Sequence, residues 1–209
     1  LSIARSAIQA QQYGLNVAGH NISNVNNPEY SRQTLPMESR HAINYGGLIF
    51  GTGVTVDDIN QVVNKYMEAR LTDNTSNKSS LEESQNYMNV LDSLLNENGD
   101  SSISSLLSDF FGSWQDLSNN PGGTAERTAV YESGVMLSQE LKNLNNGLSE
   151  LQTDLTKEVE AGVEKVNQIS AEIAKVNQSI LSQETIGQTA NDLRDKRTGL
   201  IRELGTYID

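Results

Sequence analysis

Cysteine is absent from this chain of 209 residues, and aromatic residues make up only 5% of it. Without cysteine, neither a disulfide framework nor a thiolate metal site can form. Three phenylalanines and one tryptophan are too few to anchor a broad globular core, and hydrophobic residues reach only 36%, below the usual share in globular domains. We therefore expect narrow seams of leucine, valine, isoleucine and alanine between helices.

Positive charge is also scarce, since the net charge is −12 and the pI is near 4.6. Residues 1–60 hold three arginines against four acidic residues, so −11 of the total −12 falls on residues 61–209. No basic stripe is available to bind phosphates, and no apolar run is long enough to span a bilayer. We expect neither nucleic-acid binding nor membrane insertion.

Residues that carry chemistry are few and scattered. The two histidines, His20 and His41, have no Asp, Glu or His at metal-ligand helical spacing. The stretch from Asp73 resembles a calcium loop only briefly, because Lys78 stands where glycine is needed and Ser84 where glutamate is needed. No serine lies in a nucleophile elbow. The sequence predicts no catalytic, cofactor or metal site, and hence no enzyme.

The opening residues predict a helix with one shallow apolar face. The members of this face are small or medium-sized residues at helical spacing, namely Ala4, Ile8, Leu15, Ala18, Ile22 and Val25. Such a face suits packing against another helix. Asn26, Asn27 and Pro28 then end the helix, because asparagine tolerates the geometry of a helix end and the proline disfavours a helical conformation at Asn27.

Residues 30–60 predict a short extended segment. Residues 30–37 follow the proline as extended chain, and GGLIFGTGVTV at 46–56 indicates a glycine-rich turn and then a strand in which Val54 and Val56 alternate with Thr55. Gly51 and Gly53 lack the third glycine of a nucleotide-binding loop. Hairpin glycines explain them better.

The chain is expected to be helical from about Val62 onward. A first heptad phase, with polar interruptions, runs through Val63, Met67, Leu81, Met88, Leu91 and Leu95. We expect Gly99 to end this helix and Asp100 or Ser101 to cap the next one. The apolar stripe of that next helix, interpreted as local core, comprises Ile103, Leu107, Phe110, Trp114 and Leu117.

A very long helix is predicted after the NNPGG break at 119–123. Apolar residues recur at spacings of mostly three and four from Leu137 to Ile180, as in a coiled coil. Unbroken from Ala125 to Ile186, this helix would be roughly 90 Å long. Gly187 is expected to end it and Asn191 or Asp192 to cap a last helix. That helix has an apolar face of Leu193, Leu200, Ile201 and Leu204.

The predicted fold is therefore mainly α, with long helices in coiled-coil or bundle packing and a short extended or β segment at about residues 30–60. We expect two domains. Residues 1–60 would form a terminal segment of helix, Asn/Pro joint and hairpin-like stretch, and residues 61–209 would form a helical, rod-like domain.

One stretch is diagnostic. NISNVNNPEYSRQ at 21–33 resembles the N-terminal signature of the bacterial flagellar axial proteins, the family of rod, hook and hook-associated subunits. GTGVTVDDI at 51–59 is similar to the stretch by which these chains enter their next domain. LLSDFFGSWQDLSNNP at 106–121, Arg127 and NDLRDKRTGLIREL at 191–204 resemble the FlgK family of hook-associated proteins. Asn64 departs from the family, in which aspartate is commoner at that position.

The resemblance implies a non-catalytic structural subunit of the bacterial flagellum, located outside the cell and exported through the flagellar type III system. It would self-assemble at the distal end of the hook and form the hook–filament junction. The implied partners are the flagellar hook protein, the second hook–filament junction protein, an export chaperone and further copies of this chain in a ring or tube. Family members are longer and end in a second terminal helix that pairs with the first, so this chain resembles an N-terminal portion.

Two alternatives remain open at this point. One is another rod or hook subunit, and the other is an unrelated acidic coiled-coil binding module. The assembly-interface candidates are the apolar residues Ala4, Ile8, Leu15, Ile22 and Val25 and the polar or aromatic residues Asn21, Asn24, Tyr30, Arg32 and Gln33. We also expect Ile22, Val25 and Tyr30 to pack. Hydrogen bonds to neighbouring backbone are expected from Asn21, Asn24, Arg32 and Gln33. The competing interpretation of residues 24–33 is a solvated loop without an interface role.

Overall fold

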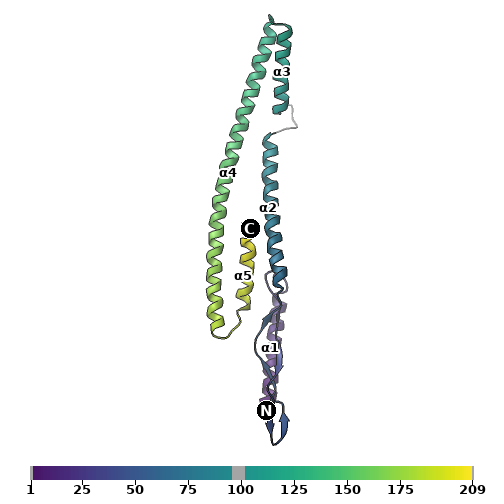
Figure 1. The fold of residues 1–209 in the computed structure, drawn as a ribbon, viewed down its shortest axis with the longest axis vertical. Helices are drawn as coiled ribbons and strands as arrows, with labels where there is room; N and C mark the ends of the chain where they lie inside the picture. The colour runs from purple at the N-terminus through teal and green to yellow at the C-terminus, as the bar shows by residue number, and fades with distance from the viewer. Residues whose placement is uncertain (1, 96–101, 209) are drawn as a thin grey trace. The chain divides into compact units, whose positions relative to one another are not determined.

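The computed structural model describes residues 2–95 and 102–208, and its helices and strands are drawn in Figure 1. The helices are α1 (Ser2–Ser23), α2 (Lys65–Leu95), α3 (Ile103–Asn119), α4 (Thr124–Thr185) and α5 (Asn191–Leu204). Between α1 and α2 lie β1 (Gln33–Thr34), β2 (Met37–Ser39), β3 (Ile43–Tyr45), β4 (Leu48–Phe50), β5 (Val54–Val56) and β6 (Asn60–Gln61). The mainly α fold and the extended segment at about 30–60 are confirmed.

The chain divides into two compact units. One contains Leu1–Asn77 and Lys165–Asp209, and the other contains Lys78–Glu164. Both α2 and α4 contribute to both units. The expected division into a terminal segment, 1–60, and a helical domain, 61–209, stays a prediction.

In the first unit, the strands fold back on one another as a two-stranded ribbon. β1 pairs with β6, β2 with β5 and β3 with β4, all antiparallel. Gly46 and Gly47 have φ values of 62° and 82°, the left-handed geometry that a tight hairpin turn requires. The predicted glycine-rich turn and the strand Val54–Val56 are therefore confirmed. Gly51 and Gly53, expected to be hairpin glycines, instead lie between β4 and β5, which pair with β3 and β2 and not with each other, so that expectation was wrong. β5 contacts α1, and a Cβ on Gly53, directly before β5, would lie 3.4 Å from Ile3 Cα.

The core of the first unit lies between α5 and the end of α4. It consists of Ile169, Val176, Ile180, Ala190 and Leu200, with Ile173, Leu193 and Leu204 packed against it. Gly187, with φ 81°, lies in the connection between α4 and α5, where Figure 1 shows the chain turning back. Ile201, which was expected on the buried face, is 43% exposed.

In the second unit, α2 and α3 run antiparallel to α4. From one contact to the next, the residue numbers on α2 and α3 rise while those on α4 fall. A Cβ on Gly147 would lie 2.7 Å from Leu94 Cδ2, and one on Gly134 would lie 3.3 Å from Phe110 Cε2. Tyr87 donates a hydrogen bond to Glu158. α4 is one continuous helix of 62 residues, which confirms the predicted long helix.

The seams are shallower than the sequence suggested. α2 is described throughout and has no buried residue. Leu91 and Leu95 are half-buried, whereas several seam members are exposed, namely Val63, Met67, Leu81 and Met88. On α3, Leu107 and Trp114 are exposed as well. These apolar positions are only partly covered because a single neighbouring helix covers only one line of side chains.

Helix caps differ in part from expectation. Ser102 caps α3, and its Oγ accepts a hydrogen bond from the Ser105 amide at 3.2 Å; Gly99, Asp100 and Ser101 lie outside the described residues. Asn64 caps α2, with its Oδ1 3.1 Å from the Tyr66 amide nitrogen. Asparagine and aspartate both serve as caps, so the departure at Asn64 preserves this role. The N-cap of α5 is Ala190, without a side-chain hydrogen bond, so the predicted cap at Asn191 or Asp192 is wrong.

Candidate assembly interface

α1 ends at Ser23 and is followed by the joint, defined here as residues 24–33. Asn24 Nδ2 donates to the carbonyl of His20 at 3.0 Å, which occupies a helix-end acceptor. Asn27 Oδ1 accepts from the Glu29 amide at 3.1 Å, a local turn contact typical of asparagine. The Asn/Pro stretch therefore ends the helix and turns the chain, as predicted.

Asn21, in the last turn of α1, acts as a strand partner for Gln33. Its Nδ2 donates to the Gln33 carbonyl at 2.9 Å, and its Oδ1 accepts from the Gln33 amide at 2.8 Å. Gln33 is only 6% exposed, and buried main-chain groups need such partners. One amide side chain thus satisfies both main-chain groups of the first residue of β1.

Tyr30 contacts His20 and Asn21 at the same place. Because Asn21 Oδ1 can only accept, the Tyr30 hydroxyl must donate to it across 2.8 Å. The remaining contact of the hydroxyl oxygen, 3.2 Å from His20 Nδ1, then requires an N–H at Nδ1. The two rings meet edge to face, with centroids 5.2 Å apart. Burial, with the nearby carboxylates of Asp192 and Asp195, raises the pKa of Tyr30.

The first turns of α5 contact the joint from the other side. Asp195 Oδ2 accepts from the Ser31 amide at 2.9 Å, and Asp192 Oδ1 accepts from Gln33 Nε2 at 3.0 Å. Asp192 Oδ2 also lies 3.8 Å from His20 Nε2. Sequence reasoning missed these contacts, because it took Asp192 for a helix cap and assigned no role to Asp195.

α5 also holds the end of the ribbon where β6 lies. Gln61 Nε2 donates to the main-chain carbonyl of Asn191 at 2.8 Å, and Asn191 Nδ2 donates to the Ile59 carbonyl at 2.6 Å. Asn191 does not cap its own helix, because its side chain bonds to the carbonyl of Ile59, directly before β6. Both strands at the base of the ribbon, β1 and β6, are thus bound to α5.

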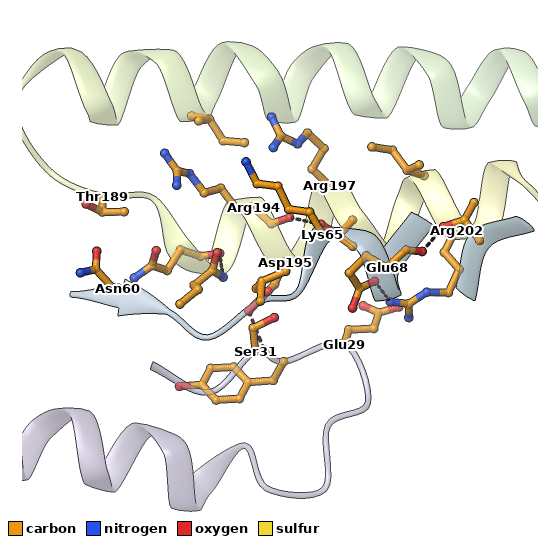
Figure 2. A pocket seen from close by; sticks show the side chains of 18 of the residues that line it. Glu29, Ser31, Asn60, Lys65, Glu68, Thr189, Arg194, Asp195, Arg197 and Arg202 are labelled. Carbon is orange, nitrogen blue, oxygen red and sulfur yellow. Dashed lines mark hydrogen bonds and ion pairs between the residues drawn. The ribbon is translucent and has the colours of Figure 1, made fainter. Parts of the chain in front are cut away.

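A groove of about 840 Å³ lies between α5, the joint, β6 and the start of α2. Figure 2 shows Asp195 next to Ser31, to which it is hydrogen-bonded, and the Glu68–Arg202 ion pair at 2.8 Å between α2 and α5. Its charges are mixed and partly paired. Within the described ranges, 2–95 and 102–208, no three His, Cys, Asp or Glu side chains are grouped to hold a metal ion.

The apolar face of α1 points away from the rest of the first unit. Ile8, Leu15, Ile22 and Val25 are 61%, 73%, 73% and 74% exposed, and Ala4 is exposed as well. The buried side of α1 carries Ala10 and Val17 instead, because the ribbon lies on that side. Ile22 and Val25 therefore do not pack within this chain, contrary to expectation. Their role between chains stays a prediction.

The polar candidates of the joint behave differently from one another. Asn21 and Asn24 bond to backbone as expected, and Tyr30 packs. The Gln33 side chain bonds instead to a carboxylate, that of Asp192. Arg32 contributes its carbonyl, which accepts from the Val62 amide at 2.9 Å; its side chain is exposed and makes no hydrogen bond or ion pair to the residues that the structure describes.

Together these features define a class: a helical protein with shallow seams, whose first helix presents an unpaired apolar face beside a hydrogen-bonded joint. None of the helices in the described part of the chain is both long and apolar enough to cross a membrane. Residues 88–209 match the helical domain of the flagellar hook-associated protein FlgK. The match covers more than half of the sequence, and the chain belongs to the FlgK family.

Curated relatives agree with this family. Flagellar hook-associated protein 1 of Bacillus subtilis is 27% identical over 217 residues, which cover 100% of this chain and 43% of the relative. The proteins of the same name from Escherichia coli and Salmonella typhimurium are 28% and 29% identical, each over 98% of this chain and 38% or 37% of the relative. The chain thus spans less than half the length of these relatives. No solved structure matches it significantly.

Proposed function

We propose that this chain is part of a structural, non-catalytic subunit of the bacterial flagellum that assembles at the distal end of the hook and forms the hook–filament junction. The subunit is exported by the flagellar type III system and acts outside the cell. Its partners are the hook protein, the second junction protein, an export chaperone and further copies of itself. FlgK-family membership over residues 88–209 supports this role.

The observation that carries the proposal is the exposed apolar face of α1. Ile8, Leu15 and Ile22 are each more than half exposed, although apolar side chains at one helical face are normally buried against a partner. The opposite face is already covered by the chain's own ribbon. The exposed face is therefore available for a second helix, either the terminal helix expected in the longer protein or a neighbouring copy.

The test begins with deletion of the source gene, electron microscopy of the cells and an assay of flagellin in the medium. Hooks without filaments, together with shed flagellin, are the expected result. Missing hooks would move the assignment to a rod or hook subunit. Normal filaments would overturn the proposal and favour the acidic coiled-coil binding module.

A matched pair of variants tests the interface itself. Leu15→Glu and Asn16→Glu add the same charge at adjacent, exposed positions of α1, but only Leu15 belongs to the apolar face. Expressed as the full-length protein in the deletion strain, Asn16→Glu should restore filaments and Leu15→Glu should not. Export of both variants into the medium is the control for folding and secretion. Equal restoration by both would argue against an interface at this face.

A further inference from the structure

We propose that Asp192 and Asp195 of α5 are positioning residues for assembly: they hold the joint in one conformation and thereby fix the direction in which α1 presents its apolar face. This inference rests on the proposed function and adds a role for α5, which contacts the joint from more than a hundred residues away in the sequence. We call the two carboxylates and their joint partners the α5 latch.

The Asp195 carboxylate is the stronger half of the latch. Asp195 is only 7% exposed, and an ionised carboxylate in such a position is costly unless it is hydrogen-bonded. Its Oδ2 accepts from the Ser31 main-chain amide at 2.9 Å. A hydrogen bond to a charged acceptor is about twice as strong as a neutral one. Moving the Ser31 segment away would leave the carboxylate without this donor, so the contact selects one conformation of the joint.

Asp192 extends the latch to α1. It precedes Asp195 by three residues and so lies on the same side of α5. One oxygen accepts from the Gln33 side chain at 3.0 Å, and the other lies 3.8 Å from His20 Nε2. This carboxylate therefore contacts the last part of α1 and the first residue of β1, the two ends between which the joint turns.

The latch is separate from what holds α5 in place. α5 is anchored by apolar packing of Leu200 against α4 and by ion pairs such as Arg194–Glu184 at 2.6 Å. These contacts do not involve the joint. Loss of the two carboxylates should therefore leave α5 folded and free the joint to take other directions, which would misdirect the apolar face of α1.

The experiment uses the full-length protein with Asp195→Ala, Asp192→Ala and, as a matched control, Lys196→Ala, an exposed residue of the same helix. Hydrogen exchange measured by mass spectrometry on a peptide that contains Ser31 and Gln33 reports on the latch. We expect Asp195→Ala to speed exchange there by about tenfold or more, with exchange in α5 unchanged. Asp195→Asn keeps an acceptor oxygen and should recover most of the protection.

Filament formation in the deletion strain gives the second readout. Faster exchange at the joint together with fewer filaments for Asp195→Ala or Asp192→Ala, and neither effect for Lys196→Ala, supports the inference. Unchanged exchange would overturn the latch. Faster exchange with normal filament numbers would overturn its role in assembly. If the deletion strain itself keeps normal filaments, the proposed function fails, whereas the exchange result still decides whether the latch exists.

Discussion

Asn21 connects α1 to β1 through its side chain alone, because it bonds to both the amide and the carbonyl of Gln33. Asn21→Ala would leave both of these main-chain groups unpaired at a residue that is 6% exposed. The free energy of unfolding should fall by about 1–3 kcal/mol, as measured by urea denaturation.

Asn26 is the matched control for this change. It is exposed, lies in the same joint and makes no side-chain hydrogen bond to another described residue. Asn26→Ala should therefore change the free energy of unfolding by no more than about 0.5 kcal/mol. Equal losses for the two variants would mean that Asn21 is not a strand partner in solution.

Because the pKa of Tyr30 is raised, we expect the stability of the folded protein to depend on pH in the alkaline range. Its pKa is raised by burial and by Asp192 and Asp195, so the folded state holds the phenolic proton more tightly than the unfolded state does. The stabilisation is fully present below the ordinary tyrosine pKa of about 10 and is lost as the pH rises through the raised pKa.

Tyr30→Phe removes this titrating group. The free energy of unfolding, measured by urea denaturation from about pH 8 to about pH 11, should decline less steeply above about pH 10 in Tyr30→Phe than in the unchanged protein. Tyr45→Phe alters a tyrosine that is 78% exposed and serves as the control. A decline of the same steepness in Tyr30→Phe and the unchanged protein would contradict the burial of Tyr30.

At the scale of elements, alanine substitutions at two glycines inside α4 distinguish the effect of helix propensity from the effect of packing. A Cβ on Gly162 would meet no atom within 4 Å, whereas one on Gly147 would meet Leu94 Cδ2 at 2.7 Å. Alanine is favoured over glycine within a helix by about 1 kcal/mol. Gly162→Ala should therefore raise the free energy of unfolding by about 0.5–1 kcal/mol, as measured by thermal and urea denaturation.

Gly147→Ala is the matched comparison on the same helix. The Leu94 side chain must move to admit the new methyl group, so the gain in propensity is offset and the increase in stability should be smaller or reversed. An equal increase in the free energy of unfolding for both variants would show that α2 and α4 do not pack against each other at Leu94 and Gly147 in solution.

The elements themselves were largely predictable from the sequence. α4 follows from leucine, valine and isoleucine at spacings of three and four, and the hairpin turn follows from Gly46 and Gly47 between apolar residues. The exposure of the apolar positions on α2 and α3 was not predictable, because periodicity identifies an apolar face but does not tell how much of that face a neighbouring helix covers. Met88 and Trp114 lie in the predicted stripes and are 64% and 50% exposed.

The candidate site was predictable only where its contacts are local. Asn24 bonds four residues back, and Asn27 bonds two residues ahead, so residue type and spacing suffice there. Asp195 bonds to Ser31, 164 residues away, and no local pattern indicates that pairing. Asp192 lies in the first turn of a helix, where an acidic residue is usual for a different reason, its interaction with the helix dipole.

At the scale of the whole molecule, α1 has two faces with separate roles, and substitutions should separate them. Val17 is 8% exposed on the face that the chain itself covers, and Leu15 is 73% exposed on the opposite face. Val17→Ala removes buried apolar atoms and should lower the free energy of unfolding of the monomer by about 1–2 kcal/mol. Leu15→Ala should change it by less than about 0.5 kcal/mol.

In assembly, Leu15→Ala should have the larger effect and Val17→Ala the smaller one. Leu15→Ala removes apolar surface that is buried only when a partner helix arrives, so it should reduce filament formation more than Val17→Ala does under conditions where both variants are folded. Monomer unfolding in urea is measured on residues 1–209, in which the face of Leu15 is exposed, and filament counts by electron microscopy are made with the same two substitutions in the full-length protein. If Leu15→Ala destabilised the monomer as much as Val17→Ala, the apolar face would be internal, since only a side chain packed within its own chain affects stability before assembly.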